Sequence, residues 1–249
     1  MTILCYHAVD PDWVGAMSVH PADFARQAAW LSAHRRVVPL ADVLGRASRS
    51  GRLPRGSVAL TFDDGFESVY DHALPVLRKH RLPATVFLVA QTLTPRGQLV
   101  DWVRTPPAVP LRTLTREQVL EMQAAGVDFQ SHSWAHRDLP DLDPTECERD
   151  LRDSRELLED LLGRPVTSLA YPRGRHDEQV RVAAERAGYA FAVALPEQAE
   201  QPGRYAVPRV GVYHGNGPGT LRIKTTRSYL PVRHNRVLRR LRAGVRRSS

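Results

Sequence analysis

Short apolar runs of strand length alternate with helical segments along most of this 249-residue chain. Residues 84–90 form the clearest run, because their side chains are almost continuously apolar or β-branched, as in a parallel strand buried on both faces. The expected strands are residues 3–6, 58–62, 84–90, 127–130, 166–170, 189–194 and 206–210. About seven alternations of strand and helix predict a parallel α/β fold, in which catalytic residues gather at the carboxyl ends of the strands.

The segments between these runs carry helix signals. Residues Thr115 and Gln118 have the spacing of a capping box, and Asp143 precedes a proline as an N-cap residue does. The proline-punctuated segment 98–114 is expected to be irregular. In residues 21–34, Phe24, Ala28 and Leu31 fall on one helical face. The expected helices are residues 21–34, 68–80, 115–126, 143–163 and 178–187.

The length suits one α/β domain of barrel size, and 42% hydrophobic residues are ordinary for a globular core. The two cysteines, Cys5 and Cys147, are too few for a disulfide scaffold, so we expect unpaired thiols in a reducing compartment. The N-terminus lacks the basic and apolar regions of a signal peptide, and no apolar stretch is long enough for a membrane span. These features predict a cytoplasmic protein.

Two adjacent carboxylates, Asp63 and Asp64, follow the expected strand 58–62 in the sequence Thr-Phe-Asp-Asp-Gly. Neighbouring carboxylates repel each other unless a cation stabilises them, so a divalent metal on one would leave the other free as a base. An ordinary turn rich in aspartate and glycine is the alternative interpretation.

Two histidines, His132 and His136, follow the strand 127–130 in the sequence His-Ser-Trp-Ala-His. Neutral imidazoles are common ligands of zinc-like metals, and one helical turn would bring both onto one face. Alone, the pair could equally be two ordinary loop histidines. Together with an aspartate and an open water position, they make the donor set of a catalytic metal site.

These two motifs, with Ala-Tyr-Pro-Arg-Gly at residues 170–174, resemble the polysaccharide deacetylase family, also called the NodB homology domain or carbohydrate esterase family 4. The resemblance covers most of residues 1–215 and implies a distorted (β/α)7 barrel. It implies that Asp63 is the general base and that Asp64, His132 and His136 bind the metal. It further implies that the backbone N–H of Arg173 stabilises the oxyanion.

The chain departs from the commonest family pattern. Ala170 stands where an arginine usually holds the base, and the usual C-terminal histidine acid and acidic fourth motif are not evident. The subgroup of poly-N-acetylglucosamine deacetylases resolves much of this, because its members carry an N-terminal Tyr-His, here Tyr6-His7. That likeness makes His7 the expected general acid. We also expect Arg209, in Val-Pro-Arg-Val, to replace the arginine near Asp63.

The resemblance predicts a metal-dependent hydrolase that removes N-acetyl groups from an amino sugar or glycan and releases acetate. The donors suit zinc best, and also accept iron, cobalt or nickel. Tyr171 and Trp134 are candidates for stacking on sugar rings, and either could instead pack internally. The alternatives are a hydrolase of a non-sugar amide on the same scaffold and a non-catalytic glycan-binding protein.

Seven of the eight net positive charges lie in residues 233–249, where seven arginines and no acidic residues occur. We therefore divide the chain into a catalytic domain, residues 1–230, and a basic tail, residues 231–249. Apolar residues spaced four apart in the tail suit a short amphipathic helix on an anionic membrane surface, and a solvated tail is the alternative. A near-neutral body without a recognised motif argues against a nucleic-acid binder.

Overall fold

The computed structural model describes residues 1–50, 56–103, 105–196, 201–226 and 228–234. Parallel strands form one sheet in the order β10-β9-β8-β7-β6-β5-β1-β11, and β4 adds to β5. The strands are β1 (Thr2–Tyr6), β4 (Arg36–Val37), β5 (Ser57–Phe62), β6 (Ala84–Leu88), β7 (Asp128–Ser131), β8 (Ser168–Ala170), β9 (Phe191–Ala194), β10 (Val207–Pro208) and β11 (Val210–Gly211). Strands β2 (Ala8–Val9) and β3 (Ser18–Val19) pair separately.

The two ends of this sheet meet at a single residue. Val207 and Pro208 pair with β9, whereas Val210 and Gly211 pair with β1, and only Arg209 lies between the two pairs. The sheet is therefore nearly closed into a barrel, as expected for a distorted (β/α)7 fold. The expected strand at residues 206–210 is interrupted at Arg209, because its two halves pair with opposite ends of the sheet.

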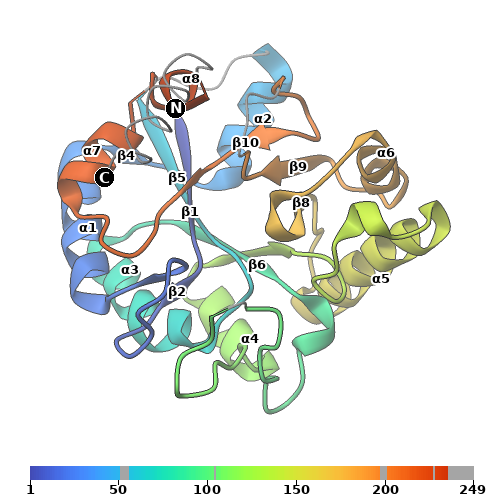
Figure 1. Ribbon diagram of the computed structural model, residues 1–249, viewed down its shortest axis with the longest axis horizontal. Helices are drawn as coiled ribbons and strands as arrows, with labels where there is room; N and C mark the ends of the chain where they lie inside the picture. The colour runs from blue at the N-terminus through green and yellow to red at the C-terminus, as the bar shows by residue number, and fades with distance from the viewer. Residues whose placement is uncertain (51–55, 104, 197–200, 227, 235–249) are drawn as a thin grey trace, which may run out of the picture.

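Helices surround the sheet, with α1, α3 and α7 on one side and α5 and α6 on the other (Figure 1). Phe24, Ala28 and Leu31 of α1 are buried, which confirms the predicted inner face. Phe24 packs edge-on against Tyr6, which stacks on Phe62, so α1 is fixed against the ends of β1 and β5. The helices are α1 (Pro21–His34), α2 (Leu40–Ser50), α3 (Leu74–His80), α4 (Arg116–Ala124), α5 (Pro144–Leu162), α6 (Glu178–Arg186), α7 (Pro218–Lys224) and α8 (Tyr229–His234).

The two helix starts predicted from capping residues, at Thr115 and Asp143, are confirmed. The Thr115 hydroxyl accepts from the Gln118 N–H, and the Gln118 side chain accepts from the Thr115 N–H, which completes the capping box of α4. The Asp143 carboxylate accepts the N–H groups of Thr145 and Glu146 at the start of α5. Such caps satisfy backbone donors that have no partner within the helix.

The expected helix 68–80 is divided into a π-helix, η1 (Val69–Ala73), and α3. Pro75 at the start of α3 has no N–H to give the carbonyl four residues earlier, and the backbone widens into π-type hydrogen bonds just before it. The expected strand 84–90 also ends early, at Leu88, and a 3-10 helix, η2 (Ala90–Thr92), follows. Segment 98–114 is irregular, as predicted, apart from isolated antiparallel bridges.

Sequence reasoning did not anticipate helix α2. Its buried residues Leu40, Val43 and Leu44 span little more than one turn, and Gly45 follows them, so its apolar pattern is short. Helices α7 and α8 were also not predicted.

Helix α8 crosses the expected boundary between residues 230 and 231, and the tail beyond His234 lies outside the described residues. None of the helices in the described part of the chain combines the length and apolar character that a membrane crossing requires. Cys5 and Cys147 are both unpaired and buried.

Candidate active site

The predicted polar residues converge at one end of the barrel. Asp63 and Asp64 follow β5, and His132 follows β7, two strands away across β6. His7 follows β1, the other neighbour of β5. Since all these strands are parallel, their carboxyl ends lie at the same edge, and His7 meets Asp63, 56 residues away in the chain, and His132, 125 residues away.

Asp64, His132 and His136 form a buried cluster whose candidate ligand atoms lie within 4.8 Å of one another. The Asp64 Oδ1 is 3.5 Å from His132 Nε2 and 3.2 Å from His136 Nε2. Asp64 and His136 have left-handed backbones, with φ of 70° and 54°, so the loops themselves turn these side chains inward.

Two details show that this cluster fits a metal ion. The Asp64 Oδ2 is buried and has no hydrogen-bond partner among the described residues, which is costly for a carboxylate oxygen unless a cation approaches it. The His132 Nδ1 is 2.8 Å from the Ala170 carbonyl oxygen and so must carry the proton. The Nε2 lone pair then faces Asp64, and such a carbonyl contact commonly orients a metal-binding histidine.

Asp63 is bound differently. Arg209 donates two hydrogen bonds to it, one to each carboxylate oxygen, both at 2.6 Å. Burial alone would raise the pKa of Asp63, but the adjacent Arg209 guanidinium lowers that pKa to about 2. The expected contact between Arg209 and Asp63 is therefore present, and the low pKa keeps Asp63 ionised at neutral pH.

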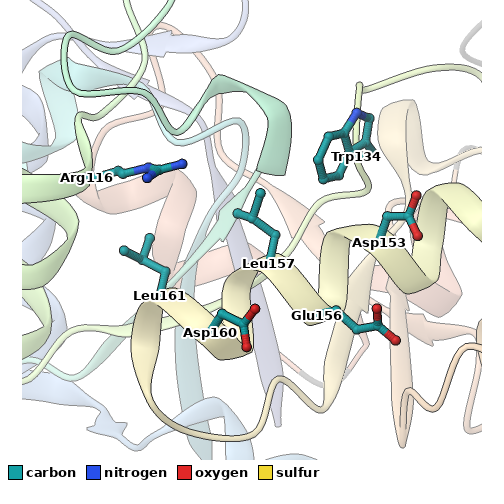
Figure 2. A pocket seen from close by; sticks show the side chains of 7 residues that line it. All are labelled: Arg116, Trp134, Asp153, Glu156, Leu157, Asp160 and Leu161. Carbon is teal, nitrogen blue, oxygen red and sulfur yellow. The ribbon is translucent and has the colours of Figure 1, made fainter.

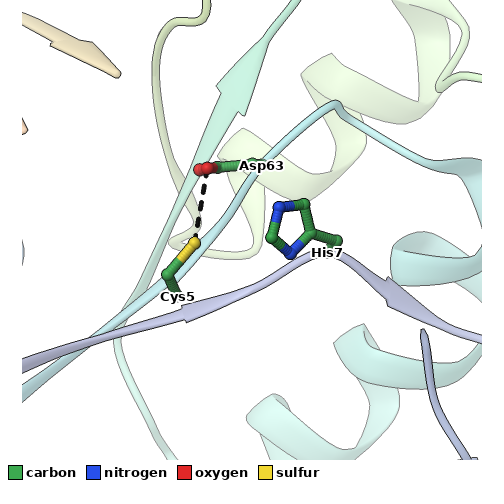
Figure 3. A group of neighbouring side chains, drawn as sticks. All are labelled: Cys5, His7 and Asp63. Carbon is green, nitrogen blue, oxygen red and sulfur yellow. Dashed lines mark hydrogen bonds between the residues drawn. The ribbon is translucent and has the colours of Figure 1, made fainter. Parts of the chain in front are cut away.

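Cys5 and His7 complete the surroundings of Asp63 (Figure 3). The Cys5 thiol donates a hydrogen bond to Asp63 Oδ2 at 3.3 Å, and burial raises its pKa well above the usual range. His7 is 5% exposed, and its Nδ1 has no hydrogen-bond partner. Burial lowers the pKa of His7 below its ordinary value.

A cavity of about 390 Å³ opens onto these residues. Asp63, His132 and His136 line its polar part, and His7 lies beside them. The remaining wall is mostly apolar and comes from several loops: Trp13, Ala16, Met17, Trp102, Val103, Thr105, Arg173, Gly174, Leu195 and Tyr213. Such a mixed wall suits a ligand with one reactive polar group and an apolar substituent.

Trp102 is a site residue that sequence reasoning missed. Its Nε1 donates to Asp64 Oδ1 at 3.3 Å, and its ring stacks on His136 with 5.1 Å between centroids. It comes from the irregular segment 98–114, which carries no periodic signal. A tryptophan within a long proline-rich loop was the only available hint.

Arg173 lies in the cavity wall with a left-handed backbone, φ 55°, and its guanidinium pairs with Asp138 at 2.8 Å. Gly174 follows with φ 68°, and a Cβ there would lie 2.9 Å from the Leu195 carbonyl oxygen. This tight turn therefore requires glycine at position 174.

The two aromatic candidates for sugar stacking lie outside this cavity. Tyr171 is fully buried, donates to the Tyr205 carbonyl at 2.9 Å and stacks on His176, so it packs beneath the site. Trp134 lines a separate groove against α5 (Figure 2). The structure thus separates both rings from the reacting centre.

Comparison with known proteins agrees with this geometry. A family model described as polysaccharide deacetylase matches residues 50–192. The Bacillus subtilis protein YxkH is 28% identical over 219 residues, which cover 86% of this chain and 72% of that protein. The poly-beta-1,6-N-acetyl-D-glucosamine N-deacetylase of Staphylococcus epidermidis is 28% identical over 205 residues, covering 78% of this chain and 67% of that protein.

The fold is also shared with solved structures. The Streptococcus pyogenes deacetylase PplD, solved in complex with acetate, superposes with a TM-score of 0.77 at 24% identity, covering 91% of this chain and 98% of that chain. IcaB from Ammonifex degensii gives a TM-score of 0.70 at 26% identity, covering 85% of this chain and 91% of that chain. Since the family match extends over more than half of its residues, the chain belongs to the polysaccharide deacetylase family and is a hydrolase of N-acetyl amide bonds on carbohydrates.

Proposed function

We propose that this protein is a metal-dependent N-deacetylase of an N-acetylated glycan, releasing acetate and leaving a free amino sugar. One observation carries the proposal: an Asp-His-His donor cluster lies beside a second, ionised carboxylate at one end of a cavity. A purely glycan-binding protein would need neither the orphaned Asp64 oxygen nor the oriented His132 ring.

Asp64, His132 and His136 would hold the metal. One carboxylate and two neutral imidazoles suit zinc, and also admit iron, cobalt or nickel. When bound, such a cation supplies Lewis-acid polarisation of an amide carbonyl and acidifies a water molecule. Three protein ligands leave further coordination positions for substrate and water, as catalytic sites require.

The surrounding residues would move the protons. Asp63 takes a proton from the attacking water, and Arg209 holds the Asp63 carboxylate in place through its paired hydrogen bonds. The backbone N–H of Arg173 stabilises the developing oxyanion. His7 then donates a proton to the departing nitrogen; burial lowers its pKa, so its protonated form is a stronger acid than that of an exposed histidine.

The substrate class rests on the family and on the cavity wall. The apolar side chains of Trp13, Met17 and Val103 suit an acetyl methyl group and the faces of sugar rings. The Staphylococcus epidermidis relative is named for poly-β-1,6-N-acetyl-D-glucosamine. Oligomers of β-1,6-linked N-acetylglucosamine are therefore the first substrates to test, with β-1,4-linked oligomers beside them.

The test is acetate release from these oligomers by metal-stripped protein and by protein restored with zinc, cobalt, nickel or iron. We expect only the metal-restored protein to release acetate. It should act faster on oligomers of one of the two linkages than on simple acetamides. Equal release from metal-stripped protein would contradict the proposed metal dependence. Release from acetamides but from no oligomer would favour a non-sugar amide as the substrate.

A further inference from the structure

We propose that Cys5, His7 and Asp63 form a second metal site, which takes a thiophilic divalent cation such as zinc, cobalt or cadmium. Each residue offers one candidate ligand atom, and these atoms all lie within 4.8 Å of one another. All three residues are buried, and the mechanism above leaves Cys5 without a chemical role. Figure 3 shows the three side chains converging from the ends of β1 and β5.

The donors form a set that zinc-like cations favour: one sulfur, one imidazole nitrogen and one carboxylate oxygen. Sγ of Cys5 is 3.3 Å from Asp63 Oδ2, so the two are already close enough to share a partner. The shared partner is now the thiol proton. A cation would replace that proton, which leaves to solvent as the S–H bond is exchanged for a sulfur–metal bond.

The His7 imidazole supplies an independent indication. Its Nδ1 is buried, with the residue only 5% exposed, and has no hydrogen-bond partner in the part of the chain that the structure describes. A buried ring nitrogen without a partner is energetically costly. His7 and Asp63 both line the cavity, so a cation arriving there reaches two of the three donors directly.

Arg209 determines the relative strength of the two metal sites. Its guanidinium is hydrogen-bonded to both oxygens of Asp63 and offsets the negative charge there. Among the described residues, Asp64 is contacted by His132, His136 and Trp102, and no arginine or lysine offsets its charge in this way. The second site should therefore bind more weakly and fill only after the Asp64, His132 and His136 site is occupied.

Filling this site would inhibit the enzyme. A cation on Asp63 and His7 would engage the proposed base and the proposed acid together, so deacetylation should fall at excess metal. This consequence rests on the proposed function, whereas the existence of the site does not.

The experiment is a cobalt titration of metal-stripped protein, followed by absorption spectroscopy and equilibrium dialysis. The first equivalent should enter the Asp64 site, whose nitrogen and oxygen donors give no thiolate-to-cobalt charge-transfer band. The second equivalent should produce that band in the near ultraviolet. Cys5→Ser should remove the band and the second equivalent, and keep the first.

The other buried thiol provides a matched control, because the chain has two cysteines. Cys147→Ser, in helix α5, should leave both equivalents and the band unchanged. Binding of a single equivalent by the wild type, a band that persists in Cys5→Ser, or a band lost in Cys147→Ser would each overturn the proposal. If Cys5→Ser does not fold, the wild-type and Cys147→Ser titrations still decide it.

His136→Ala separates this proposal from the proposed function. That variant should lose the first equivalent and keep the charge-transfer band. Were the acetate-release test to fail while the band still depended on Cys5, the second site would stand without the deacetylase mechanism. Were acetate release observed without any thiolate band, the mechanism would stand alone.

Discussion

Asp63 and Asp64 are neighbours in the chain and almost equally buried, yet their surroundings differ. Asp63 lies against an internal cation, the Arg209 guanidinium. Asp64 lies against two histidines and a tryptophan N–H, and its Oδ2 has no partner. Two adjacent carboxylates thus avoid mutual repulsion in two ways: the fold supplies a fixed cation to one, and leaves the other arranged for a cation from solution.

The variant that should separate the two carboxylate environments most strongly is His136→Ala. Removing one of three ligands from the Asp64 cluster should cost the metal equivalent that this cluster holds, and turnover should fall with it to near background. Elemental analysis after dialysis measures the metal, and acetate release measures the turnover. Full metal occupancy in His136→Ala would contradict the ligand assignment.

Asp63→Asn should lower turnover without removing metal from the Asp64 cluster. The amide keeps the shape of the side chain but cannot accept a proton, so turnover should fall roughly 10²- to 10⁴-fold while the Asp64 cluster keeps its metal equivalent. The same two measurements apply. Unchanged turnover would remove Asp63 from the role of base.

Arg209→Met tests whether the internal cation stabilises the fold through Asp63. Leaving a buried carboxylate without its partner should lower the free energy of unfolding by about 3–5 kcal/mol, measured by urea denaturation. The control is Arg152→Met, which breaks a surface pair with Glu148 and should change the free energy by less than about 1 kcal/mol. Equal changes in the free energy of unfolding for the two variants would contradict a stabilising role of the buried Arg209–Asp63 pair.

His7→Ala should lower turnover roughly 100-fold without loss of metal from the Asp64 cluster, if His7 is the general acid beside Asp63. His80→Ala, at the end of α3, is a matched control and should have little effect on turnover. If turnover of His7→Ala falls by less than about threefold, the loss is too small for an acid catalyst, and another group must donate the proton.

The smallest expected effect is on acid stability. The pKa of Asp63 lies at about 2 in the folded protein, below its ordinary value of 3.8, so its contribution is present above pH 4 and is lost as the pH falls through 2. This group should contribute about 2 kcal/mol to the free energy of unfolding. Urea denaturation of metal-stripped wild type and Asp63→Asn between pH 5 and 2 measures it, and identical pH slopes would contradict it.

Local patterns predicted most of the elements. The capping residues Thr115 and Asp143 fixed two helix starts, because a cap depends on residues only two or three positions away. One prediction failed because a proline inside the expected helix was overlooked, and another because distant strands decided the backbone. Pro75 divides the expected helix 68–80, and competing strand partners divide the expected strand at Arg209.

The candidate site shows the same division. A metal site of one carboxylate with His132 and His136 could be identified from spacing, since each motif directly follows an apolar strand and parallel strands bring such ends together. The choice of Asp64 over Asp63 came from the family resemblance. Trp102 and Cys5 could not be identified as site residues, because nothing near them in the sequence indicates which side chains they contact. Tyr171 was a candidate for sugar stacking or for internal packing, and the structure shows internal packing, with its hydroxyl donating to the Tyr205 carbonyl.

The sequence by itself determined that this chain forms a parallel α/β fold and carries two carboxylates and two histidines at strand ends, because strand periodicity and motif spacing are local properties. The family resemblance implied different roles for the two carboxylates and Arg209 near Asp63, but only the tertiary structure shows how the fold gives each carboxylate its partners. Arg209 reaches Asp63 across 146 residues only because β10 and β11 pair with opposite ends of the sheet and leave Arg209 between them. That contact depends on closure of the whole barrel, which no stretch of sequence around either residue encodes.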